Sequence, residues 1–286
     1  MTFGINTFLF TSPFTTDSIA LFPKFKQWGF DAVELAIEDA SHIDAEVVKK
    51  ALDDNGLTCP SVCAAMGPGR DLRGTPEEQQ TSVAYIKSVL DLMPVLGCRV
   101  LSGPLYSTVG RCEPVTEEDH KKQWATVVGH LKELSQYAHK LGVKLAIEPL
   151  NRYETDFINT VAQGIKMIKD VDHEASLLHY DTFHMNIEEK DQVNAILAAG
   201  DKLGHFHACG SDRGTPGGDH LDWAAINGAL QQVNYKGAII IESFTTDVKV
   251  IARAASIWRK LAPSQEDIAV KGLAFLKANI KTGLIY

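Results

Sequence analysis

The sequence contains no long apolar run: none approaches the roughly 20 residues that a membrane-spanning helix needs. Cysteine is also sparse, and the five cysteines are an odd number without the spacing of a disulfide framework, so we expect reduced thiols. The residues from Met1 to Thr7 have neither a basic start nor an apolar core and do not resemble a signal peptide. From these absences we expect a soluble, cytoplasmic protein without a membrane partner.

Positive charge is in deficit as well. The chain has 28 Lys and Arg against 36 Asp and Glu, a formal net charge of −8. An acidic chain gains nothing from neutralising phosphates, so this balance disfavours a nucleic-acid partner. The first strand-like run is not followed by a Gly-x-Gly-x-x-Gly segment, which disfavours a dinucleotide-binding fold.

Short apolar runs alternate with longer amphipathic segments, a pattern typical of parallel strands joined by crossover helices. The expected strands are 3–8, 32–37, 58–65, 99–105, 143–150, 175–181, 203–209 and 237–243. The expected helices are 18–28, 45–55, 76–96, 117–141, 161–171, 192–199 and 223–233, followed by a C-terminal pair near 249–261 and 265–280. Eight such units favour a closed (β/α)₈ TIM barrel with an extra C-terminal helix. No linker interrupts residues 1–286, so we predict one domain.

Four of the expected strands close on a residue that can bind a metal: Glu148, Asp181, His207 and Glu242. Strand alternation turns these four side chains inward, while neighbours such as Leu145 and Ile147 turn outward. The C-terminal ends of barrel strands share one rim, where active sites lie. Three carboxylates and one imidazole suit Mn²⁺, Mg²⁺ or Co²⁺ better than a structural Zn²⁺, and a metal there indicates an enzyme.

The same alternation places Glu34, His179 and His205 inside the barrel. A buried carboxylate needs a hydrogen-bond partner, so we expect Glu34 to support the site rather than to react. We expect His179 and His205 to be packed interior residues of the same kind.

The segments around these residues resemble the ketose 3-epimerase family, which includes the D-tagatose, D-psicose (allulose) and L-ribulose 3-epimerases. The run Asp181-Thr-Phe-His-Met-Asn-Ile-Glu-Glu189 looks like a signature block of that family, and Glu148-Pro-Leu-Asn-Arg-Tyr-Glu154 is similar to its Glu-x-x-Asn-Arg-Phe-Glu segment. Further matches follow in order at similar spacing: Gly204-His-x-His207, Arg213, Ile241-Glu-Ser-Phe244 and Trp258-Arg259. The resemblance spans almost the whole chain and implies the wider xylose-isomerase-like barrel superfamily.

The resemblance implies a function for each matched residue. Glu148, Asp181, His207 and Glu242 would hold the ion, for which Mn²⁺ is favoured over Co²⁺ or Mg²⁺. Epimerisation at C3 of a free ketose would run through a metal-bound cis-enediolate, with Glu148 and Glu242 exchanging the proton as base and acid. The expected substrate contacts are Glu154, His184, Arg213, Gly103 and Asn6. A homo-oligomer, dimer or tetramer, is usual in that family.

This sequence differs from the family pattern in residues beside the expected metal-binding residues, and the four metal-binding residues themselves match. It has Glu242-Ser-Phe where the family usually has Glu-Pro-Phe, Cys209-Gly-Ser-Asp-Arg where it has Gly-Glu-x-Asn-Arg, and Asn6-Thr-Phe where many members have tyrosines. These changes concern the choice of sugar more than the chemistry.

Three other functions would use part of the same pattern. An aldose–ketose isomerase needs the same metal and a base, but the Asp181–Glu189 block favours an epimerase. A metal-dependent endonuclease of this barrel type would recruit several metals with more His ligands and a basic surface, which the acidic balance opposes. A sugar-binding protein without catalysis would not need paired carboxylates at a metal.

Overall fold

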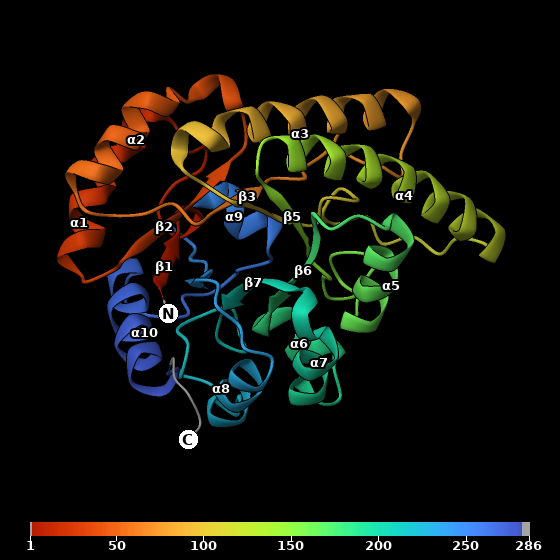
Figure 1. Cartoon of the computed structure of the whole chain (residues 1–286). Helices are drawn as coiled ribbons and strands as arrows, with labels where there is room; N and C mark the ends of the chain where they lie inside the picture. Colours follow the sequence, from red (N-terminus) through yellow and green to blue (C-terminus); the bar gives the residue numbers. More distant parts are fainter. Residues whose placement is uncertain (1, 282–286) are drawn as a thin grey trace.

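The computed structural model describes residues 2–281, and its centre is a closed barrel of eight parallel strands in sequence order (Figure 1). The strands are β1 (Phe3–Asn6), β2 (Ala32–Ile37), β3 (Ser61–Ala64), β4 (Val100–Gly103), β5 (Lys144–Ile147), β6 (Ser176–Asp181), β7 (Leu203–Ala208) and β8 (Ile239–Ile241). Pairing of β1 with β8 closes the barrel. The predicted TIM barrel is confirmed, with strands shorter than predicted at several ends.

Helices surround the barrel, and their bounds follow local signals in the sequence. They are α1 (Phe22–Gln27), α2 (Ala45–Asp54), α3 (Pro76–Leu96), α4 (Glu117–Lys140), α5 (Val161–Val171), α6 (Thr182–Glu188), α7 (Gln192–Ala199), α8 (Trp223–Gln232), α9 (Lys249–Ala254) and α10 (Gln265–Asn279). Helix α3 shows why the bounds could be predicted: Thr75 and Glu78 form a capping box, and Gly97 ends the helix in a left-handed conformation (φ +71°).

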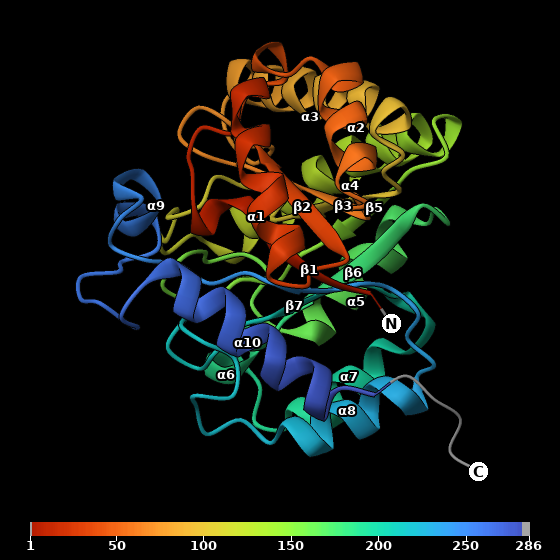
Figure 2. The ribbon, with the colours of Figure 1, turned by 90° about the vertical axis from the view of Figure 1, so that its left-hand side faces the viewer.

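Two C-terminal helices lie outside the regular β/α repeat. Helix α10 packs against β1 and β8, and Figure 2 shows it lying along the barrel wall. Helix α9 stands apart at one end of the barrel in the same view. It ends at Ala254, seven residues before the predicted 261, because Ser256 adopts φ +56° and turns the chain.

Two layers of side chains follow from strand alternation. Val33, Leu35 and Ile37 of β2 face outward into the large core shared with the helices and are fully buried. Full burial of such a side chain stabilises the fold by about 1.5–3 kcal/mol. Ala36 faces the other way and packs in a smaller cluster with Phe8 and others. The barrel interior holds polar residues such as Glu34 and His205 beside the apolar Ile240, and all three are buried.

Within residues 2–281, no helix combines the length and the apolar character needed to cross a membrane.

Candidate active site

The strand ends bring together the four predicted metal-binding residues. Glu148 follows β5, Asp181 ends β6, His207 lies near the end of β7 and Glu242 follows β8. Ligand atoms from all four lie within 4.8 Å of one another, and all four residues are buried. The β6–β7 register pairs Asp181 directly with His207, so the shared rim expected from the sequence is present.

The donor atoms of this group fit a divalent cation. Glu148 Oε1, Asp181 Oδ2 and His207 Nδ1 are buried and have no hydrogen-bond partner among residues 2–281. His207 Nδ1 lies 3.3 Å from Glu242 Oε2 and 3.9 Å from Asp181 Oδ2. Three buried carboxylates repel one another, and unpaired buried charge is costly. Oxygen-rich donors with one imidazole suit Mn²⁺, Mg²⁺ or Co²⁺, so these residues could hold such an ion.

The carboxyl groups of the site differ strongly in acidity in the metal-free chain. Burial, reinforced by Glu242 and Asp181, raises the pKa of Glu148 well above its usual value. Burial also raises the pKa of Asp181 to about 7, although Arg213 opposes it. For Glu242 burial is outweighed by His207 and Arg213, which lower its pKa to about 2. Glu148 therefore favours the protonated form and Glu242 the ionised form.

Arg213 links two carboxylates at the edge of the site. Its Nη2 donates to Glu242 Oε2 at 2.9 Å and its Nη1 to Glu154 Oε1 at 3.2 Å. The guanidinium carbon lies 4.4 Å from the ring centre of Phe244 and 4.7 Å from that of Phe183. This packing holds a fixed positive charge beside Glu242.

His184 lies on α6, a short helix that begins directly after β6 and was not predicted. Asp181 caps α6 by accepting a hydrogen bond from the backbone N–H of Phe183 at 2.7 Å. His184 Nδ1 accepts from the backbone N–H of Asn151 at 3.0 Å, so the ring proton must lie on Nε2. That Nε2 lies 3.8 Å from Glu148 Oε1 and has no hydrogen-bond partner in the described part of the chain. Burial, with Arg213 and His207, lowers the pKa of His184, so it offers a neutral N–H donor.

A cavity of about 290 Å³ opens beside these groups, close to the lower end of the range for small-molecule sites. Its polar side is formed by Glu148, Glu154, His184, Arg213 and Glu242. Phe8, Met66, Phe244 and residues of α9 provide apolar wall. A second polar group lines the cavity from the loops after β1, β2 and β3, which contribute Ser12, Glu38 and Arg70.

These three residues hold one another in place. Glu38 accepts hydrogen bonds from Ser12 Oγ at 2.6 Å and from the backbone N–H of Phe14 at 3.0 Å. Arg70 donates to the carbonyl oxygens of Glu38 (2.6 Å) and Ala65 (2.8 Å). Sequence reasoning did not single them out, because a loop residue carries no periodic signal that predicts which cavity it will face.

Two predicted substrate contacts, Asn6 and Gly103, do not line this cavity. Both polar atoms of Asn6 are engaged inside the barrel, where Nδ2 donates to Glu34 at 2.7 Å and Oδ1 accepts from the backbone N–H of Phe8 at 2.8 Å. Gly103 has φ +123°, and its carbonyl oxygen accepts from the backbone N–H of Glu148 at 3.1 Å. Both residues are thus hydrogen-bonded to neighbouring parts of the barrel, and their substrate contacts stay predictions. Asn6 ends β1 and caps the short 3-10 helix Thr7–Leu9, and its residue type, which favours such caps, was the available signal.

Similarity to known proteins extends over most of the chain. Residues 22–279 match the family model described as "Xylose isomerase-like TIM barrel". "Probable ketose 3-epimerase" of Synechocystis sp. is 35% identical, with 98% of this chain and 97% of that protein covered. "D-psicose 3-epimerase" of Agrobacterium fabrum is 33% identical, with 84% and 83% covered. The crystal structure of D-allulose 3-epimerase from Methylomonas sp. in complex with D-allulose superposes with a TM-score of 0.89 at 29% identity, covering 98% of this chain and 97% of that one.

Proposed function

Since the chain belongs to the ketose 3-epimerases of the xylose isomerase-like TIM barrel family, and is thus an isomerase, we propose that it inverts C3 of free ketoses with a divalent metal ion. The substrates would come from the class that its relatives' names give, D-psicose (D-allulose) and L-ribulose, together with D-fructose and D-tagatose, which occur in solved structures of D-psicose 3-epimerases. The observation that carries the proposal is the meeting of two buried glutamates, Glu148 and Glu242, with Asp181 and His207 within 4.8 Å.

The same four residues would hold the ion. Mn²⁺ is the ion that we propose, with Co²⁺ or Mg²⁺ as alternatives, because the donor set is three carboxylates and one imidazole. When bound, the ion would act as a Lewis acid that stabilises negative charge developing on the substrate oxygens next to C3.

Glu148 and Glu242 would move the proton. Inversion at C3 requires one group to remove the proton from one face and another to return a proton on the opposite face. The two glutamates approach from β5 and β8, which are three strands apart in the barrel. Their environments shift their pKa values in opposite directions in the metal-free chain, raised for Glu148 and lowered for Glu242, as in other acid–base pairs. Their roles would exchange with the direction of the reaction.

Three neighbours would bind the O1–O3 end of the sugar. His184 offers its Nε2–H, Arg213 offers a guanidinium, and Glu154 offers a carboxylate that can accept from a hydroxyl. Fixed donors of this kind stabilise charge that develops on a substrate oxygen during reaction. Phe8 and Phe244 would limit the access of water to the reacting carbon.

The test determines which carbon of the product sugar takes up deuterium from the solvent. Mn²⁺-loaded protein is incubated in D₂O with fructose, tagatose or ribulose, and the products are followed by NMR. We expect the C3 epimer with deuterium at C3. Aldose products labelled at C1 or C2 would instead identify an aldose–ketose isomerase. We also expect a homo-oligomer, a dimer or tetramer, which light scattering after size-exclusion chromatography would measure.

A further inference from the structure

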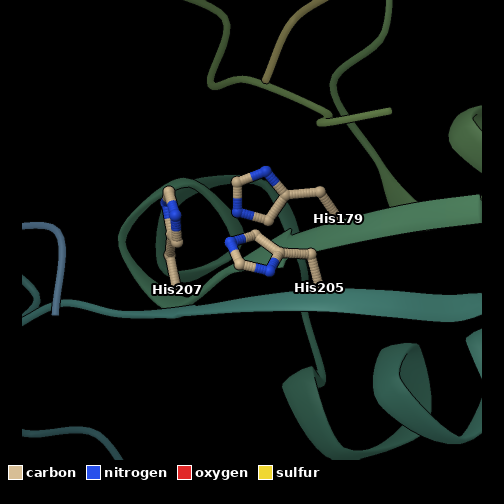
Figure 3. A group of neighbouring side chains, drawn as sticks. All are labelled: His179, His205 and His207. Carbon is tan, nitrogen blue, oxygen red and sulfur yellow. The ribbon is translucent and has the colours of Figure 1, made fainter. Parts of the chain in front are cut away.

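A buried carboxylate lies beneath the metal-binding group. Glu34 of β2 is fully buried, and its two oxygens face donors from β1 and β7. His207 Nε2 lies 2.6 Å from Oε1, His205 Nε2 lies 2.6 Å from Oε2, and Asn6 Nδ2 donates to Oε1 at 2.7 Å. Figure 3 shows His205 and His207 side by side on β7, with His179 of β6 next to them.

The partners of Glu34 are oriented so that it can only accept. Asn6 Oδ1 is occupied by the backbone N–H of Phe8, so the Asn6 amide group must turn its N–H donors toward Glu34. The carboxylate therefore takes the Nε2–H of His207. This contact leaves Nδ1 of His207 as the ring nitrogen that faces Glu242 and Asp181, where no described residue forms a hydrogen bond with it.

We propose that Glu34 is a positioning residue that fixes the ring orientation and tautomer of His207, so that Nδ1 binds the metal. The inference rests on the proposed function. A metal-binding histidine commonly donates its other N–H to a carboxylate, and loss of such a partner weakens metal binding by about 10–100-fold. Here the Glu34 carboxylate lies at hydrogen-bond distance from His207, His205 and Asn6. Contacts among β1, β2 and β7 therefore determine how the His207 ring is oriented.

The three imidazoles could be taken for a second metal site, because nitrogens of His179, His205 and His207 also lie within 4.8 Å of one another. Two ligands on one tetrahedral zinc ion would be about 3.3 Å apart, given bonds of about 2.0–2.1 Å. Nε2 of His205 and Nε2 of His207 each lie 2.6 Å from an oxygen of Glu34. This is a hydrogen-bond distance and is shorter than the separation of two ligands on one ion. Among the described residues, both ring nitrogens of His179 lack a hydrogen-bond partner, and so does Nε2 of His205, which faces Glu34. We therefore expect one ion per chain.

The first experiment measures Mn²⁺ binding by calorimetry for the full chain and for Glu34→Gln. The variant keeps the shape of the side chain but turns an amide N–H₂ toward one of the donors. We expect its dissociation constant to rise about 10–100-fold, and turnover to recover as Mn²⁺ is raised. The matched control is Glu188→Gln, which removes another largely buried carboxylate (side chain 5% exposed) that pairs with Arg152 outside the cavity. Its Mn²⁺ affinity should equal that of the unmodified protein.

The second experiment needs no variant at Glu34. In ¹⁵N-histidine-labelled protein loaded with diamagnetic Mg²⁺, His207 should carry its proton on Nε2, with the signal assigned by its loss in His207→Gln. A proton on Nδ1 would overturn the positioning role, even if Glu34→Gln does not fold. So would equal Mn²⁺ affinity in Glu34→Gln and the unmodified protein. Two ions per chain would show that the imidazole group binds metal itself, whereas no binding to the unmodified protein would overturn the proposed function.

Discussion

Arg213 donates a hydrogen bond to Glu242 at 2.9 Å, and its second terminal nitrogen donates to Glu154 at 3.2 Å. The loop after β7 thus places a buried guanidinium against the carboxylate that follows β8. Because Glu242 is also 3.3 Å from His207 Nδ1, one carboxylate lies between the guanidinium of Arg213 and the imidazole of His207. This arrangement lowers the pKa of Glu242 and keeps it ionised, as the proposed role of proton acceptor requires.

Arg213→Lys should lower kcat/KM for the ketose by about 10- to 100-fold. Lysine keeps the charge but cannot donate to Glu154 and Glu242 with one planar group. A hydrogen bond to a charged group contributes about 1.5–3 kcal/mol, which corresponds to this factor. The matched control is Arg259→Lys, at an arginine whose side chain is 69% exposed and pairs with Asp212 at 3.5 Å. Steady-state kinetics should show no change for the control, and equal losses in both variants would contradict the role of Arg213.

Glu242→Gln should abolish turnover while the fold survives. The amide has nearly the same volume and can still accept the Arg213 hydrogen bond, but it cannot take a proton. Circular dichroism should match the unmodified protein, while exchange of the C3 hydrogen in D₂O falls below detection. Appreciable residual epimerisation would remove Glu242 from the acid–base pair.

Asp181→Asn should stabilise the metal-free protein against urea, increasingly so from pH 4 to pH 7. Burial raises the pKa of Asp181 to about 7, against about 3.9 in an unfolded chain. In this window the folded protein binds a proton that the unfolded chain has lost, so this residue's contribution falls as pH rises, by up to about 1.4 kcal/mol per pH unit.

The comparison between the two proteins isolates that contribution. Burial lowers the pKa values of His179, His184 and His205, and these groups add stability as pH rises, so the absolute curve mixes opposite signs. With EDTA, the difference in free energy of unfolding should grow with pH. With Mn²⁺ the order should reverse, because the ion stabilises the protein that binds it more tightly. A difference that does not depend on pH would refute the raised pKa.

Gly4→Ala should destabilise the protein by about 1–3 kcal/mol, the usual cost of overpacking. A Cβ at Gly4 would lie 2.5 Å from Ile240 Cδ1 and 3.1 Å from the carbonyl oxygen of Ala32. Gly129 is exposed on α4, and a Cβ added there would meet no described atom within 4 Å, so Gly129→Ala should stabilise the protein by about 0.5–1 kcal/mol. Urea denaturation of the two variants measures whether the free energy of unfolding falls for Gly4→Ala and rises for Gly129→Ala. A stabilised Gly4→Ala would mean that the barrel interior can adjust there.

The sequence predicted elements best where local signals were complete. Helices α3, α5 and α7 begin and end at the predicted residues, because their first residues are capped by Thr75, Thr160 and Asp191. Helix α6 was missed. It has only seven residues, too few for helical periodicity, and its cap is Asp181, which the strand pattern had already assigned to the site.

The amino-acid sequence alone determined the barrel and the inward direction of Glu148, Asp181, His207 and Glu242, because strand alternation is local and has a period of two. It also indicated that Glu34 lies inside. Only the tertiary structure decided which partners these side chains take. Glu34 meets Asn6 from 28 residues away and His207 from 173 residues away. Such contacts depend on barrel closure and register, which bring distant strand ends to hydrogen-bond distance, and no local pattern encodes them. Barrel closure determines which nitrogen His207 turns toward Glu242 and which loops after β1 to β3 line the cavity. It also brings Asn6 to Glu34.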